Sequence, residues 1–568
     1  MKLKRNIIHL FLATAFLGLA GCETMDLDQN EDPSALAENY LDPIYTFNYA
    51  QLQLPVFVNS ANTFTQRVTR QMAMTGGNTY NNAFAPVNFD TNWTNGYLIL
   101  NAIKVMEPKA IEMDENFILG ASKVIRSYVL MTMVDMYGDI PYSEALQGNS
   151  NLSPKFDSSE AVYAGVYNEL NDAIALLNMP SESQARDLYY GGTEGNPNAP
   201  AWITLANTLK LKMLNNARLQ SSFGGVNVAS EVNAILAENN IIDTIEEDFA
   251  FRYGSERDLP NSRHPQYNAS YEFGGAPYLG NYFMWAVSAE KGAAISDPRE
   301  EYYFFRQVAA ISGNSVNSQT VPCLFSVTRP DHYDDDEYDS FYDTAINAPY
   351  CTVDSNLYLG RDHGDWSGLP ADDDLRTVVG LYPAGGAIGS PTPVVDTAGE
   401  RGALGQGIMP IVMSSFVHFI KAELILTGVA TTGDARAELE EGIRQSITKV
   451  TTFLPQQPGE PTDADIASEV GPYLNFVLGR YDSFSDVANK LQIIIKEYYI
   501  AAWGNGVEPY NNYRRTGYPD NFQPTIEQDS GQFFNTALYP GVSVNNNLNA
   551  PNNVRTKRVF WDAGLTLH

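Results

Sequence analysis

Cys22 is the side chain whose surroundings most clearly indicate a defined chemistry. It directly follows Leu19-Ala20-Gly21, and a short basic start and an apolar run from Ile7 to Leu19 come before it. That run has the length of a signal-peptide core and is too short for an ordinary membrane-spanning helix. Signal peptidases cut after small residues, and Ala20 and Gly21 supply them. Cleavage there would leave the Cys22 thiol at the new N-terminus, where it can be acylated.

Leu19-Ala20-Gly21-Cys22 resembles the bacterial lipobox, so we predict a lipoprotein. Residues 1–21 would be a signal peptide, and Cys22 would carry fatty acyl chains such as palmitate. Several chains anchor stably, because each buried methylene adds about 0.8 kcal/mol and one chain alone is marginal. The alternative is an ordinary secretion signal followed by a chance cysteine. Residues 22–33 are polar and acidic and read as a flexible tether.

Two further cysteines, Cys323 and Cys351, remain for redox chemistry. Outside the cytoplasm they could form a disulfide, and the alternative is two buried free thiols. We favour the disulfide slightly. The fold does not depend on it, because 44% of the residues are hydrophobic and suffice for a core.

Motifs for other chemistries are missing from the sequence. There is no His-Glu-x-x-His, no G-x-S-x-G, and neither a phosphate-binding loop nor a dinucleotide fingerprint. We therefore predict no metal and no cofactor. The acid run Asp331–Asp339 lacks the EF-hand pattern, so a solvated loop is favoured over a calcium site. A glycosidase pair of Asp or Glu residues stays open, because acids are abundant.

The net charge of −31 excludes one large class of partners. Such a surface repels phosphate backbones and anionic lipid, so we predict no nucleic-acid binding. Beyond residue 21 we expect no membrane-spanning helix. Aromatic residues make up 12% of the chain, with 33 tyrosines, which suits neutral, hydroxyl-rich or peptide-like ligands.

The elements that must position any site are mainly helices. Apolar periodicity, caps and terminal glycines predict helices over 35–53, 59–74, 90–106, 115–137, 158–178, 202–220, 230–239, 411–427, 434–451 and 486–503. Gly, Pro, Asp, Tyr and Asn dominate the stretch 241–409, and a long irregular stretch of this kind usually carries function. The predicted organisation is a domain over 34–568, with a helical scaffold at 34–240 and 410–515 and an irregular binding region at 241–409.

Several stretches, in order along the chain, resemble one family. They are Tyr137–Leu146, Trp202–Lys212, Asp297-Pro298-Arg299, Gly360–Asp365 with Arg376-Thr377 and Tyr382–Gly386, Ala422-Glu423, Glu508–Pro519, and Phe560-Trp561-Asp562. Each is weak alone, but together they are similar to the SusD/RagB-like outer-membrane lipoproteins of Bacteroidetes.

The resemblance implies a mainly α, SusD-like fold, in which tetratricopeptide-like helix pairs carry an irregular ligand-binding insertion. It implies a lipid-anchored protein of the cell outer membrane, facing the cell surface. Its partner would be a SusC-like TonB-dependent barrel transporter, which receives captured glycans or peptides. No catalysis is implied. The alternative from a different class is a surface carbohydrate-active hydrolase.

Aromatic rings stack on the flat faces of sugars, so four rings near helix starts or in the glycine-rich region are candidates for ligand binding. They are Trp93, Tyr278, Trp285 and Trp366. For each, a packing role is the competing interpretation. Trp202, Trp503 and Trp561 are assigned to the core. His363, with Asp362 and Asp365, is interpreted as a hydrogen-bonded loop clasp rather than a metal or acid–base site. For Arg514 and Arg515, internal salt bridges or helix-end contacts are favoured over a ligand carboxylate.

Overall fold

A computed structural model describes residues 42–74, 80, 83–273, 277–292, 294–308, 358–364, 376–394, 399–525 and 530–567. Pro43–His568 form one compact unit, to which the following description refers. The predicted signal peptide, tether, Cys22, Cys323, Cys351 and Trp366 lie outside the described residues, as does the acid run 331–339. Predictions for them therefore stay predictions.

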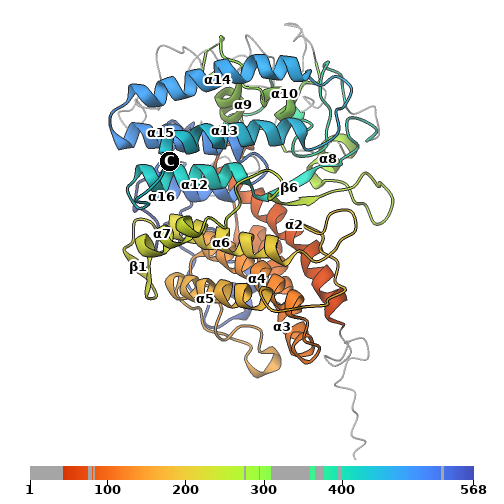
Figure 1. The fold of residues 1–568 in the computed structure, drawn as a ribbon, viewed down its shortest axis with the longest axis vertical. Coiled ribbons are helices and arrows are strands. Elements are labelled where there is room, and N and C mark those ends of the chain that lie inside the picture. The colour runs from red at the N-terminus through yellow and green to blue at the C-terminus, as the bar shows by residue number, and fades with distance from the viewer. Residues whose placement is uncertain are drawn as a thin grey trace, which may run out of the picture. The chain divides into compact units, whose positions relative to one another are not determined.

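The first half of the unit is a series of helices, each packed on its neighbours along the chain (Figure 1). They are α2 (Pro43–Val68), α3 (Asp90–Glu112), α4 (Asn116–Tyr137), α5 (Ser159–Leu177), α6 (Ala199–Asn216) and α7 (Val228–Glu238). Short turns η2 (Pro86–Phe89) and η3 (Gly148–Ser150) lie between them. Local signals set the boundaries: Ser158 accepts a hydrogen bond from the Ala161 amide and caps α5, and Gly138 ends α4 at a φ of 79°. The predicted mainly α fold is confirmed.

Helix α2 differs from the prediction. Separate helices over 35–53 and 59–74 were expected, but one helix runs from Pro43 to Val68 through Pro55. A proline inside a helix costs about 3 kcal/mol. Full burial of side chains before and after it, including Phe47, Leu54 and Phe57, offsets that cost. Tertiary burial therefore overrides the local break.

Helix α4 is long and apolar enough to cross a membrane by length and composition alone. We expected no helix of this length and apolar composition after residue 21, and that expectation was wrong. Nearly all of its side chains, from Phe117 to Tyr137, are buried against other parts of the protein. Its apolar composition is that of a central core helix, which packs on α3, α5 and α6.

The second helical group lies late in the sequence. It comprises α12 (Ser414–Leu426), α13 (Ala435–Thr452), α14 (Asp463–Ser483), α15 (Val487–Ala501) and α16 (Val507–Thr516), and the short α17 (Gly541–Asn546) follows. Helix α14 was not predicted. Only its second half buries apolar side chains, and Gly471 and Pro472 interrupt its periodicity. A capping box between Thr462 and Asp465 starts it, which is the local signal that was overlooked.

Between the two groups the described chain forms short elements. These are β3 (Phe249–Arg252), α8 (Pro265–Tyr267), the single π-turn η4 (Asn268–Glu272), α9 (Asn281–Ser288), α10 (Glu300–Tyr303), β4 (Phe304–Phe305), β5 (Val378–Val379) and β6 (Ile408–Val412). Two short strands, β1 (Ser222–Phe223) and β2 (Val226–Asn227), lie within the first group, between α6 and α7. The strands pair antiparallel as β1–β2, β3–β6 and β4–β5. The β3–β6 pair joins the end of the first helical group to the start of the second, and β6 also contacts α2.

Candidate ligand-binding pocket

A pocket of about 170 Å³ lies between the second half of α2 and the α8–η4 turn. One six-membered ring fits a cavity of about 150 Å³. The pocket therefore has room for one six-membered ring. It is lined by Asn59, Asn62, Thr63, Gln66, Arg67, Met72, Pro265, Gln266, Ala269, Ser270, Pro277 and Val379. Among these lining residues there is no Asp or Glu.

One face of α2 supplies most of the polar lining. Asn59, Thr63, Gln66 and Arg67 are spaced by four, three and one residues, which places them on one side of a helix. Gln66 is 2% exposed, and its Nε2 is buried without a hydrogen-bond partner among the described residues. A buried donor of this kind is normally satisfied, so a ligand oxygen that reaches it would supply the missing acceptor.

The opposite wall is the turn that begins at His264. The Gln266 amide donates to His264 Nδ1 over 3.1 Å, and burial lowers the pKa of His264 to about 3. The imidazole is therefore neutral at physiological pH and acts as a fixed acceptor that holds the turn. The Gln266 side chain reaches across to Gln66, where its Nε2 lies 3.5 Å from Oε1. The two amides thus face each other across the pocket.

Tyr278 is the predicted ligand-binding residue that lies nearest to this pocket in the chain, because its neighbour Pro277 lines the wall. Its ring is partly exposed. The guanidinium carbon of Arg361 lies 4.4 Å from the ring centroid and that of Arg376 lies 5.1 Å from it. Two cations at these distances hold the ring in a fixed orientation. Tyr278 stays a prediction as a ligand contact.

The other predicted aromatic contacts are placed differently. Trp93 is 7% exposed and packs on Tyr137, with ring centroids 5.1 Å apart. Trp285 is 5% exposed and lies beside Tyr282, at 5.8 Å. Neither lines the pocket, and both stay predictions as ligand contacts. The assignment of Trp202, Trp503 and Trp561 to the core is confirmed, since all three are fully buried.

The hydrogen-bonded loop clasp predicted at His363 is confirmed for His363 and Asp362, which the structure describes. His363 Nε2 lies 2.8 Å from the Tyr80 hydroxyl, and the His363 amide donates to the Gln523 side chain. Asp362 accepts hydrogen bonds from Asn281 and Gln523. The neighbouring Asp365 lies outside the described residues. Within the described part of the chain, no group of three or more His, Cys, Asp or Glu side chains could hold a metal ion.

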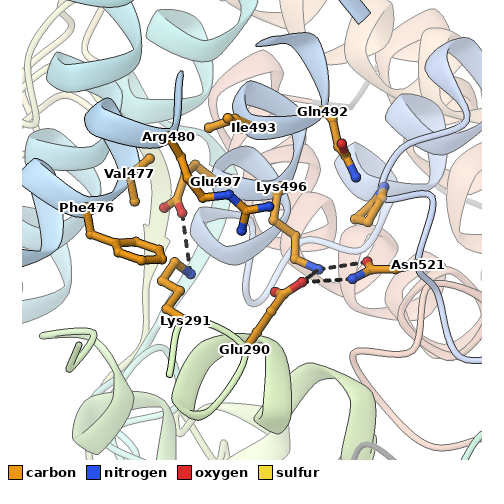
Figure 2. Close-up of a pocket in the computed structure, with 11 residues that line it drawn as sticks. Glu290, Lys291, Phe476, Val477, Arg480, Gln492, Ile493, Lys496, Glu497 and Asn521 are labelled. Carbon is orange, nitrogen blue, oxygen red and sulfur yellow. Dashed lines mark hydrogen bonds and ion pairs between the residues drawn. The ribbon is translucent and has the colours of Figure 1, made fainter. Parts of the chain in front are cut away.

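A second cavity of about 60 Å³ lies between the end of α9, helices α14 and α15, and the loop at Asn521 (Figure 2). Its charges pair with one another. Lys496 contacts Glu290 at 2.9 Å, Lys291 contacts Glu497 at 3.5 Å, and Asn521 donates to Glu290 over 2.8 Å. This cavity is smaller than a sugar ring, and Lys496 and Lys291 each have a carboxylate partner within it. We therefore interpret it as a junction between elements.

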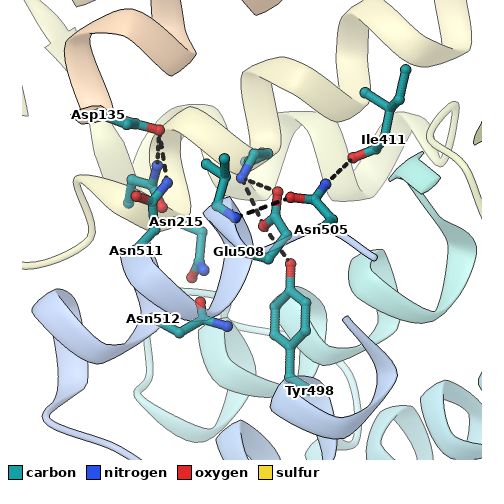
Figure 3. A network of polar contacts seen from close by, with 12 residues as sticks. Asp135, Asn215, Ile411, Tyr498, Asn505, Glu508, Asn511 and Asn512 are labelled. Carbon is teal, nitrogen blue, oxygen red and sulfur yellow. Dashed lines mark hydrogen bonds and ion pairs between the residues drawn. The ribbon is translucent and has the colours of Figure 1, made fainter. Parts of the chain in front are cut away.

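The C-terminal motif residues form a buried polar network rather than a ligand site (Figure 3). Glu508 accepts hydrogen bonds from Lys212 and Tyr498, both over 2.7 Å. Asn511 donates to Asp135 over 2.7 Å and Asn505 donates to the Ile411 carbonyl. These contacts tie α16 to α4, α6 and α15, and tie Asn505, just before α16, to β6.

The two arginines of the same motif are also internal. Arg515 forms an ion pair with Glu423 at 2.7 Å, and Arg514 donates to the Asn535 carbonyl over 2.7 Å. The favoured internal salt bridge is confirmed for Arg515, whereas Arg514 is buried and bonds to a backbone carbonyl and to Asn511.

A third pocket, of about 570 Å³, has an acidic lining beside α10 and the start of α14. Its carboxylates are Asp297, Glu300, Glu301, Glu460, Asp465 and Glu469. Burial raises the pKa of Glu300 to about 7. Asp297 is already paired with Arg299, with 2.8 Å between Oδ2 and Nη2.

The pocket between α2 and the α8–η4 turn, called the amide pocket from here on, was not predicted from the sequence. The signal that could have indicated it is the polar stripe Asn59, Thr63, Gln66 and Arg67 near the end of an otherwise apolar helix. The opposite wall could not have been predicted, because Gln266 reaches α2 only through the tertiary fold.

Two family models match the chain. Residues 28–320 match a SusD-like model described as "Starch-binding associating with outer membrane", and residues 406–553 match one described as "Susd and RagB outer membrane lipoprotein". The first match alone spans more than half of the chain. A comparison with curated proteins gives no match.

Solved structures with the same fold include a SusD homologue from Bacteroides fragilis, which is 19% identical. The match covers 90% of this chain and 98% of the homologue, with a TM-score of 0.60. A chitin-binding SusD homologue from Flavobacterium johnsoniae is 19% identical, with 91% and 97% coverage and a TM-score of 0.61. A structure described as a chitin-binding protein is 17% identical, with 92% and 100% coverage and a TM-score of 0.64. At these identities the similarity shows a shared fold.

Proposed function

The chain belongs to the SusD-like family of outer-membrane proteins, and from this premise we propose that it is a non-catalytic receptor for glycans at the cell surface. It captures an oligosaccharide and delivers it to a SusC-like TonB-dependent barrel. The description of the family as starch-binding and associated with the outer membrane supports a carbohydrate ligand.

The amide pocket between α2 and the α8–η4 turn is the observation that carries the proposal. Sugar hydroxyls need both donors and acceptors, and Asn59, Thr63, Gln66 and Gln266 offer both. The partly exposed ring of Tyr278 adjoins the wall and suits the apolar face of a sugar. The lining lacks a carboxylate among its described residues, and hydrolysis of a glycosidic bond normally needs two.

The lipid anchor completes the proposal. Acylated Cys22 and the polar tether 22–33 would hold the receptor close to the membrane. Tethering converts the meeting of receptor and barrel into a nearly intramolecular event, which raises their effective concentration.

Titration calorimetry against neutral and acidic oligosaccharides and short peptides tests the proposal. At least one oligosaccharide should bind, and Gln266→Ala should weaken that binding about tenfold, since it removes hydrogen bonds to the ligand. Asn171→Ala, which removes an exposed amide from a groove beside α5, is the matched control and should change nothing. Binding of no oligosaccharide, with purification free of a barrel partner, would refute the proposal. If only peptides bind, the ligand of the receptor is a peptide and not a glycan.

A hydrolase is the second candidate, because the acidic pocket holds Glu300 at a pKa of about 7, a value suited to a general acid. If the protein is a hydrolase, it should hydrolyse a glycan, and Glu300→Gln should abolish that activity. The absence of product after long incubation would eliminate it.

A further inference from the structure

Arg67 lines the amide pocket without a counter-ion among the described residues. It lies in the last turn of α2, and its side chain is partly buried. No described residue forms an ion pair, a side-chain hydrogen bond or a ring contact with its guanidinium. Two buried arginines elsewhere have carboxylate partners: Arg299 pairs with Asp297 at 2.8 Å and Arg515 pairs with Glu423 at 2.7 Å. Arg67 therefore differs from them in a way that calls for a physical reason.

Attraction to the helix dipole does not supply that reason. A cation in the last helical turn gains about 0.3–1 kcal/mol from the dipole, and a fully solvated side chain obtains this as well. Removing a charge from water without a partner costs several kcal/mol. Burial accordingly lowers the pKa of Arg67, with no neighbouring carboxylate to oppose the effect. The dipole is too weak to explain the burial.

The surroundings of Arg67 favour a negatively charged oxygen. The neighbouring Gln66 Nε2 is a buried donor without a partner among the described residues, and none of the described residues that line the pocket is acidic. A guanidinium presents parallel N–H groups that match the two oxygens of a carboxylate. One carboxylate could therefore accept from both Arg67 and Gln66 and satisfy two donors.

We propose that this pocket recognises the carboxylate of an acidic sugar, with Arg67 as its counter-ion and Gln66 as a second donor. The inference rests on the proposed glycan-binding function and names the class of its ligand, an oligosaccharide that contains a uronic acid. The volume of about 170 Å³ fits one ring, and the neutral amides of Asn59 and Gln266 remain for its hydroxyls.

The net charge of −31 acts against an anionic ligand, but only at long range. At physiological salt the screening length is about 8 Å, so distant surface carboxylates are largely screened. A direct contact with Arg67 in a partly buried site is screened much less. Short oligouronates are therefore favoured over long polyanions.

The test compares an acid with its ester. Short oligogalacturonate, oligoglucuronate and oligomannuronate, each as the free acid and as the methyl ester, are titrated into the mature protein. The ester keeps the ring and removes the charge. At least one free acid should bind tenfold to a hundredfold more tightly than its ester, the range expected for a hydrogen bond to a charged group. This comparison needs no variant.

Variants then assign the discrimination to Arg67. Arg67→Gln should abolish the preference for the acid. Arg67→Lys should keep part of that preference, because lysine keeps the positive charge but lacks the paired N–H donors of the guanidinium. Arg480→Gln is the matched control: it removes the same charge from an exposed position that lines the second cavity. Circular dichroism verifies that each variant is folded.

Each outcome decides the assignment. Equal binding of acid and ester, binding of neutral sugars only, or an unchanged preference in Arg67→Gln would overturn it and leave glycan capture intact. Failure of every oligosaccharide, neutral or acidic, would refute the proposed function together with this inference. Binding of a peptide through its free carboxylate, with no uronate bound, would overturn the acidic-sugar assignment.

Discussion

Glu423 gives the sharpest prediction about what holds the two helical groups together. It is fully buried on α12, where it accepts from Arg515 of α16 over 2.7 Å and from Arg218, which follows α6. Burial by itself would raise the pKa of Glu423, but the attraction of Arg515 and Arg218 overrides it and lowers the pKa to about 2. The change to test is Glu423→Gln, which keeps the shape and removes the charge.

The size of the effect follows from the pKa. The change from the usual value of 4.5 to about 2 corresponds to about 3 kcal/mol of folding free energy at neutral pH. Breaking a buried pair costs about 3–5 kcal/mol, because the partner charge remains buried. We therefore expect Glu423→Gln to lower the free energy of unfolding by about 3 kcal/mol at pH 7.

The pH dependence provides an independent check. The folded pKa of Glu423 is depressed, so its contribution is complete above pH 4.5 and is lost as the pH falls towards 2. The difference in free energy of unfolding between wild type and Glu423→Gln should shrink by about 2 kcal/mol between pH 7 and pH 3. Other carboxylates titrate in both proteins and cancel in the difference.

Urea unfolding, followed by the fluorescence of the buried tryptophans, measures both quantities. Glu440→Gln is the control, because Glu440 pairs with Arg444 at 2.7 Å on the exposed face of α13. Glu440→Gln should lower the free energy of unfolding by no more than about 0.5 kcal/mol. A loss below about 1 kcal/mol in Glu423→Gln, or a difference that does not change with pH, would refute the reasoning.

Three further predictions concern residues that the sequence singled out. Cys22→Ala should release the protein from the membrane fraction and leave glycan affinity unchanged, and retention of the variant at the membrane in a strain without the barrel would contradict the anchor. Trp93→Ala should lower the free energy of unfolding by about 3–5 kcal/mol, because it empties a buried aromatic site; a tenfold loss of glycan affinity in the milder Trp93→Phe, with stability kept, would make Trp93 a ligand contact instead. Mass spectrometry of unreduced peptides should find Cys323 joined to Cys351, whereas alkylation of both thiols without reduction would establish two free cysteines.

Local patterns in the sequence determined the helical character and the family. Helices α5, α6 and α7 carry their own N-caps, at Ser158, Asn198 and Asn227, and such signals act over a few residues. The short motifs resemble the family because they occur in a fixed order along the chain. Trp202, Trp503 and Trp561 could be assigned to the core because they lie in helices or motifs of that kind.

Only the tertiary structure decided the roles of single polar side chains. Arg67 and Arg515 are both arginines at helix ends, yet Arg515 meets Glu423 and Arg67 meets no described carboxylate. The physical reason is that the energy of a charge depends on what surrounds it in space, and the surrounding groups come from distant segments. The pocket arose in the same way, because the walls that carry Gln66 and Gln266 meet only after folding.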